Sequence, residues 1–156
     1  MIVQRIAAMS VLALLAAAPG ASAQEIRGFA SAGVTSDVND QRFPAFGGGV
    51  LVDLGQPWVS AGAQGETFVS WPYFGGRAAV FGQGNLAPKK AVRPFVLAGV
   101  GFGEGAGRMF GGGVELRAPN QRLGFRFAVE DYVVRLNGFE GSRTGHQVAL
   151  RAAILF

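Results

Sequence analysis

The residues with the strongest potential for chemistry are a glycine-rich run at positions 99–113 and the only histidine, His146. Glycine-rich loops bind phosphate where a strand leads through a tight turn into a helix whose N-terminus receives the anion. The run "GVGFGEGAGRMFGGG" continues instead into "VELR", which alternates like a strand, and no Gly-Lys-Ser/Thr motif follows. Every second residue from 99 to 107 is glycine, as on one face of a curved strand. We interpret the run as a β-hairpin.

His146 lies near Asp131, Glu140 and Ser142 in the sequence, and a histidine, a serine and a carboxylate could together form a hydrolytic site. No His-x-Ser spacing occurs, however, and His146 begins an expected strand on its apolar side. We therefore interpret His146 as an interfacial polar residue and expect no catalytic site. With one histidine and no cysteine, we expect neither a transition-metal site nor another cofactor.

The N-terminal residues 1–23 have the order of a secretory signal peptide. Arg5 precedes the apolar run 6–18, and a small-residue motif ends at Ala23, so cleavage is expected between Ala23 and Gln24. The run is shorter than the ~20 residues that a membrane-spanning helix needs, which argues against a retained anchor. The mature chain, 24–156, suits one domain without disulfides. It has 13 basic and 10 acidic side chains but no basic stripe, which argues against nucleic-acid binding.

The mature chain shows a two-residue apolar period and no convincing helical period. Turn residues separate the alternating segments, which is typical of an antiparallel sheet. We expect eight strands, over 26–36, 43–53, 58–70, 77–87, 93–103, 108–117, 123–135 and 145–156.

The two faces of these strands indicate a barrel that is apolar outside and polar inside. The polar face has no lysine and only one or two charges per strand, and its many small residues suit a narrow eight-stranded lumen. The apolar face is long enough to cross a bilayer. The charges expected inside are Arg27, Glu66, Arg77, Glu115, Arg117, Arg126, Glu130 and Arg151. Isolated charges there would be costly, so we expect an ion-pair network that fills the lumen. Because five arginines face three glutamates, a narrow anion-preferring path is the alternative.

The connections and aromatic residues fit this interpretation. The turns "LGQP", "APKKAV" and "APNQ" are compact, as on the side of a membrane barrel that holds the termini, whereas the other side has the two longest loops, "SDVNDQRFP" and "RLNGFEGSRTG". Aromatic residues near the expected strand ends are candidates for girdles at the membrane surfaces; they are Trp58, Trp71, Tyr73, Tyr132 and Phe156.

The segments "RPFVLAGVGFG", "FGGGVELR", "LGFRFAVEDYVVR" and "HQVALRAAILF" resemble the small outer-membrane β-barrel proteins of Gram-negative bacteria, of the outer-membrane protein A-like type. The resemblance covers residues 93–156 well and the first four strands only in pattern. It implies contact with outer-membrane lipid and lipopolysaccharide, and insertion by the barrel-assembly machinery. The terminal signal for that machinery corresponds here to Leu150, Ala152, Ile154 and Phe156. We expect no peptidoglycan-binding domain after the barrel, so the resemblance does not imply cell-wall tethering.

The sequence therefore predicts an all-β protein, an eight-stranded antiparallel up-and-down transmembrane barrel preceded by a cleaved signal peptide. The expected function is that of a monomeric outer-membrane protein of structural or interaction type, without catalysis. The alternatives are a narrow outer-membrane channel, a lipid A-modifying barrel enzyme like the lipid A deacylases, which use a His–Ser pair with a carboxylate, and a soluble periplasmic barrel.

Overall fold

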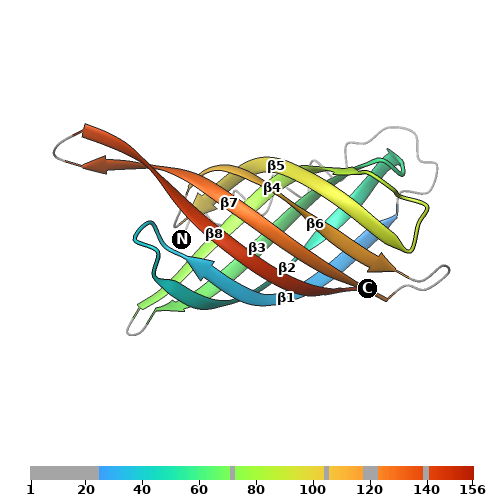
Figure 1. Cartoon of the computed structure of the whole chain (residues 1–156), viewed down its shortest axis with the longest axis horizontal. Coiled ribbons are helices and arrows are strands. Elements are labelled where there is room, and N and C mark those ends of the chain that lie inside the picture. The colour runs from blue at the N-terminus through green and yellow to red at the C-terminus, as the bar shows by residue number, and fades with distance from the viewer. Residues whose placement is uncertain (1–24, 71–72, 104–105, 118–122, 139–140) are drawn as a thin grey trace, which may run out of the picture.

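The computed structural model describes residues 25–70, 73–103, 106–117, 123–138 and 141–156. Eight antiparallel strands close into a barrel in the order of the chain (Figure 1). The strands are β1 (Ile26–Ser36), β2 (Arg42–Gln56), β3 (Val59–Ser70), β4 (Tyr73–Asn85), β5 (Val92–Gly103), β6 (Gly107–Arg117), β7 (Gly124–Gly138) and β8 (Gly141–Leu155). The fold class is thus confirmed as an all-β barrel. The predicted signal peptide and its cleavage site lie outside the described residues.

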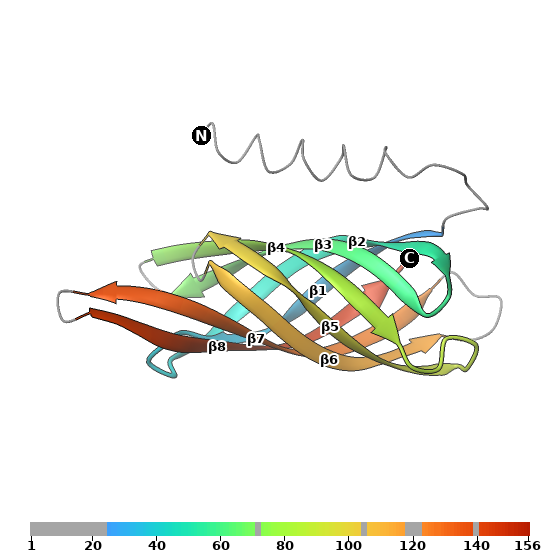
Figure 2. The same cartoon turned by 90° about the horizontal axis from the view of Figure 1, so that it is seen from above.

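The barrel closes where β1 pairs with β8, from Phe29↔Leu155 to Thr35↔Ala149. Closure gives each strand a hydrogen-bonded neighbour on both sides and so leaves the sheet no free edges over the paired length. The strands are strongly tilted and each connects to its neighbour (Figure 2). The described residues contain no helix long and apolar enough to cross a membrane.

The eight strands are found where the alternation predicts them, and most ends agree to within a few residues. β4 differs most, since it begins at Tyr73, inside a segment expected to be a turn. The two loops expected to be the longest are shorter than expected. Strand pairing continues to Gly138↔Gly141 in the β7–β8 hairpin, and β1 and β2 are joined by residues 37–41 alone. The β7–β8 hairpin therefore projects beyond the rest of the barrel as a two-stranded ribbon (Figure 1).

The glycine-rich run forms the adjacent strands β5 and β6, which pair from Val92↔Leu116 to Gly101↔Gly107. The glycines of this run allow neighbouring backbone and interior side chains to lie close to the strand inside a narrow barrel. A Cβ atom at Gly113 would overlap the backbone oxygen of Phe127 on β7, and would lie 2.8 Å from the ring of Phe95. The hairpin interpretation is therefore correct, and the glycines make room for interior side chains.

Alternation along each strand separates an apolar exterior from a mixed interior. On β5, the outward residues Val92, Val96, Val100 and Phe102 are all exposed, whereas Phe95 on the other face is buried. The other strands follow the same rule, except that the consecutive residues Leu51 and Val52 of β2 are both buried. Exposed large apolar side chains surround the barrel; they include Ile26, Phe46, Phe74, Phe110, Phe125, Phe127, Val129, Leu150 and Ile154. Buried side chains inside include both aromatic rings and charged groups.

We predict that Gly113→Ala destabilises the barrel by about 1–3 kcal/mol, because the added methyl group has no space beside the backbone of β7. The measurement is a urea titration of the folded protein, with the folded fraction read by gel mobility. Gly82→Ala is the matched control, since a Cβ atom there meets nothing within 4 Å. Equal stability of the two variants would contradict the packing role of Gly113.

Candidate functional site: the barrel interior

The interior polar side chains form two ion-pair clusters. The first, here the termini-side cluster, lies near the barrel end where β1 begins and β8 ends, and comprises Arg27, Asp53, Gln83, Glu115 and Arg126. The second, the far-side cluster, comprises Gln64, Glu66, Arg77, Glu130, Tyr132 and Arg151. In each cluster two arginines face two carboxylates, so the described side chains of the interior are formally neutral in sum.

Glu115 is the centre of the termini-side cluster. Its carboxylate accepts hydrogen bonds from Arg27 Nη1 at 2.9 Å and from Arg126 Nη1 at 2.7 Å. Gln83 links the same groups, donating to Glu115 and accepting from Arg126. The Arg27 guanidinium also reaches Asp53 at 2.7 Å. Side chains from β1, β4, β6 and β7 thus meet at one buried carboxylate.

The far-side cluster is organised by Arg77 and Arg151. Arg77 pairs with Glu66 and donates to Thr35 Oγ1 at 2.6 Å. Arg151 bridges Glu66 at 2.7 Å and Glu130 at 3.1 Å. The guanidinium of Arg77 stacks 3.7 Å from the ring centroid of Tyr132, a favourable cation–π distance. Each charge of this cluster therefore has at least one charged partner.

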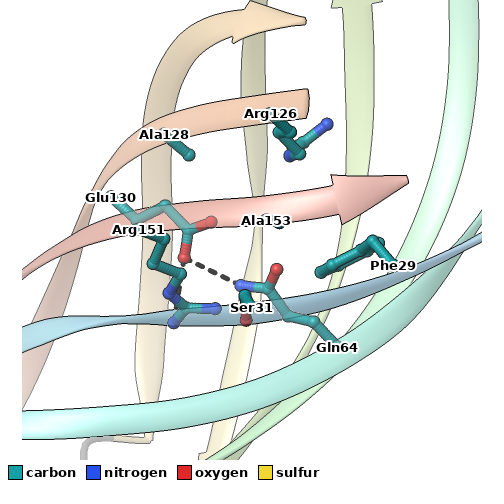
Figure 3. A pocket seen from close by; sticks show the side chains of 8 residues that line it. All are labelled: Phe29, Ser31, Gln64, Arg126, Ala128, Glu130, Arg151 and Ala153. Carbon is teal, nitrogen blue, oxygen red and sulfur yellow. Dashed lines mark hydrogen bonds and ion pairs between the residues drawn. The ribbon is translucent and has the colours of Figure 1, made fainter. Parts of the chain in front are cut away.

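Between the two clusters is a small cavity lined by residues from β1, β3, β7 and β8 (Figure 3). Its volume is about 10 Å³, which is about the minimum space for one water molecule. Arg126 lies on one side of the cavity, and Glu130 and Arg151 lie on another (Figure 3). The side chains leave no space at this level for a hydrated ion.

The structure brings together most of the charges expected inside. The buried ones are Arg27, Glu66, Arg77, Glu115, Arg126, Glu130 and Arg151. Arg117 lies at the barrel mouth instead, where it pairs with the half-exposed Glu25 at 2.6 Å. It therefore does not belong to either interior cluster.

Tyr132 contradicts its predicted place in an aromatic girdle. Its side chain is 1 % exposed and points into the barrel, where its hydroxyl donates to Glu130. It shares a face with Arg126, Ala128 and Glu130, so the strand period overrides the preference of tyrosine for membrane surfaces. Trp58, another girdle residue, is exposed in the β2–β3 turn, and Phe156 is exposed at the end of β8. Trp71 and the side chain of Tyr73 lie outside the described residues.

Sequence reasoning missed Asp53, Gln64 and Gln83 as members of the clusters. Gln64 lies on the polar face of its strand, but its side chain is uncharged and so gives a weaker signal than the charged residues. Asp53 lies on β2, where both faces consist mainly of apolar residues and glycine, so that alternation gave no direction. Asp53 is the carboxylate that balances Arg27.

His146 is exposed on the predicted outer face of β8, but it lies within the strand rather than at its start, because β8 begins at Gly141. Its Nδ1 lies 2.8 Å from Asp131 Oδ2 on β7. The neighbouring side chains of Ser142 and Glu140 lie outside the described residues. In the part of the chain that the structure describes, no group of three or more metal-ligating side chains is found.

We predict that Glu115→Gln destabilises the barrel by about 3–5 kcal/mol, because Arg126 is then left buried without a charged partner. The double variant Glu115→Gln/Arg126→Gln returns the interior to neutrality and should lose less stability than the single variant. Asp131→Asn, which breaks a largely exposed pair, should cost less than about 1 kcal/mol. Urea unfolding of all three variants is the measurement, and additive losses in the double variant would contradict the role of charge balance.

No protein-family model matches the sequence, and no curated protein matches it. Two solved structures are similar to it in fold. The N-terminal β-barrel domain of Pseudomonas aeruginosa OprF aligns with a TM-score of 0.56 at 13% identity, over 85% of this chain and 99% of that chain. Neisserial surface protein A aligns with a TM-score of 0.61 at 9% identity, over 87% of this chain and 97% of that chain. The chain therefore has the fold of the small eight-stranded outer-membrane β-barrels.

Proposed function

We propose that the chain is a small integral outer-membrane protein of structural or interaction type, with a lumen plugged by its own side chains. The observation that carries this proposal is the inside-out distribution of side chains on a closed barrel. Ionised groups are paired in the interior, and large apolar side chains are exposed around the exterior. A bilayer is the solvent that accepts both features at once.

The exterior argues against the alternative of a soluble periplasmic barrel. Phe46, Phe74 and Phe125 are each more than half exposed, and exposed apolar side chains occur on every strand. A soluble monomer rarely exposes contiguous apolar patches larger than a few hundred Å². In water this surface would drive aggregation, whereas acyl chains would cover it.

The interior argues against the alternative of a narrow channel. The expected excess of five arginines over three glutamates disappears, because Arg117 lies at the barrel mouth and Asp53 adds a fourth carboxylate. Each cluster therefore has as many carboxylates as guanidinium groups. The cavity between the clusters is also too small for a hydrated ion. These two features support the proposal of a plugged lumen without anion preference.

Outer-membrane location is supported by the two barrels of the same fold, the N-terminal β-barrel domain of OprF and Neisserial surface protein A. The residues expected to signal assembly, Leu150, Ala152, Ile154 and Phe156, form one exposed face of β8. They are therefore accessible to the barrel-assembly machinery and, after insertion, to lipid. Contact with phospholipid and lipopolysaccharide follows from the same location.

The proposed absence of catalysis rests on the surroundings of His146. Its ring is bound to Asp131 on the outer face, but the hydrogen bonds of the described residues bring no serine hydroxyl to its other nitrogen. A hydrolase needs that nucleophile within hydrogen-bonding reach of the base. We therefore assign the pair of His146 and Asp131 to the membrane surface.

We also propose that the protein is a monomer, since closure of the barrel leaves no sheet edge along the paired length.

The location is tested by fractionation of cells that express the full chain. We expect the protein in the outer-membrane fraction, with gel mobility that changes on boiling because the folded barrel resists detergent unfolding. A protein that stays in the soluble periplasmic fraction, with the same mobility before and after boiling, would exclude the membrane barrel.

The plugged lumen is tested by recordings from the purified barrel in planar bilayers. We expect no single-channel steps, because paired side chains fill the interior. Heat-modifiable mobility of the same preparation serves as the control for folding. Reproducible conductance steps from the folded protein would replace the plug with a channel.

A further inference from the structure

The described charged side chains divide into three groups that differ in balance. The interior holds four arginines and four carboxylates; they are Arg27, Arg77, Arg126, Arg151, Asp53, Glu66, Glu115 and Glu130. The far half of the exterior holds three of each sign; they are Arg42, Arg108, Arg135, Asp37, Asp40 and Asp131. The remaining group lies at the termini-side end; it consists of Lys89, Lys90, Arg93, Arg117 and one acid, Glu25. The positive excess of the described residues is therefore concentrated at one end of the barrel.

The four cations of this end form a basic sector on the β4–β5 connection and on the adjoining ends of β5 and β6. Backbone hydrogen bonds hold the connection in place. Leu86 N donates to Pro94 O at 2.8 Å, and Arg117 N donates to Ala91 O at 2.8 Å. Arg93 Nε donates to Lys90 O at 2.9 Å. The connection lies at the same end of the barrel as the C-terminus (Figure 2). The positive charge is thus fixed in one sector of the rim.

The basic sector directly borders the apolar exterior. Leu86, Val92 and Leu116 are exposed large apolar residues that flank the cations in sequence. Val92 and Leu116 are also paired neighbours on β5 and β6. In a membrane barrel this border is the level of the lipid headgroups, and lysine and arginine stems lie along apolar surface with their charges toward water.

We propose that the basic sector binds the anionic headgroups of phospholipids in the leaflet on the termini side, in preference to zwitterionic headgroups. This inference rests on the proposed membrane location. The headgroup that suits these cations is a phosphodiester that carries no cation of its own, as in phosphatidylglycerol. The bordering apolar residues favour a lipid over an anionic polymer such as peptidoglycan, because the acyl chains of the bound lipid also cover Leu86 and Val92.

The experiment uses a tryptophan beside the sector and brominated lipids as quenchers. Trp58 and Trp71 are the only tryptophans of the chain, so the reporter is Val92→Trp in a Trp58→Phe/Trp71→Phe background. The full barrel is folded into vesicles of equal parts phosphatidylglycerol and phosphatidylcholine, with one lipid brominated at a time. We expect stronger quenching by brominated phosphatidylglycerol at low salt, and a smaller preference at high salt.

Neutralising the lysines identifies the residues responsible. In the reporter background, Lys89→Gln/Lys90→Gln should lower the preference for phosphatidylglycerol, with an upper limit of about fivefold for each lysine removed. Arg93 and its contact with the backbone of residue 90 stay intact. The matched control, Arg42→Gln/Arg108→Gln/Arg135→Gln, removes three cations from the far half and should leave the preference unchanged.

The outcomes separate this inference from the proposed function. If heat-modifiable mobility shows a folded barrel but both brominated lipids quench equally, the lipid preference is wrong while the membrane barrel stands. If that barrel instead sediments with peptidoglycan sacculi, and the lysine variant does not, the sector serves the cell wall and the lipid assignment is overturned. If no folded barrel forms in vesicles, the proposed function itself fails.

Discussion

Charge neutrality inside a closed ring of eight strands is the constraint on which the rest of the structure depends. An ionised group in so narrow a lumen is held away from bulk water, and an unpaired one would cost several kcal/mol. Glu115 meets this constraint by binding Arg27 and Arg126 together, and Glu66 does the same for Arg77 and Arg151. Each carboxylate therefore joins strands that are distant in the chain, and the same contacts that neutralise charge also fix the relative positions of those strands.

The narrow lumen also explains the composition of the strands. Long arginine side chains and aromatic rings fit inside only where facing positions are small, and glycine provides that space at Gly113 beneath Phe95. Arg126 stacks 3.9 Å from the centroid of the same ring. The glycine content that suggests a nucleotide loop in the sequence is thus a consequence of barrel curvature and filling. Interior packing and exterior solvation are both set by one two-residue period.

Alternation made the strands and the interior charges predictable, because a buried charge on one face is a strong signal beside an apolar face. Prediction from the sequence failed in several places for physical reasons. Asp53 was missed because β2 is apolar or glycine on both faces, and its end is irregular at Gly55, where φ is +75°. Tyr132 was misplaced because tyrosine prefers membrane surfaces, whereas the two-residue period of β7 directs this side chain into the barrel. The connection between β7 and β8 is shorter than expected, because its polar and glycine residues fit a paired ribbon as well as a turn.

The two ends of the barrel differ in a way that follows from pairing alone. β6 pairs with β7 only as far as Val134, and β1 pairs with β8 only as far as Ala149, yet β7 and β8 continue together to Gly138 and Gly141. Beyond those limits the ribbon has strand edges without a barrel neighbour, and its outward residues include the exposed Arg135 and His146. Such residues suit water better than acyl chains, so the ribbon belongs outside the apolar belt. The ribbon therefore offers exposed side chains beyond the apolar belt, whereas the opposite end carries the basic sector.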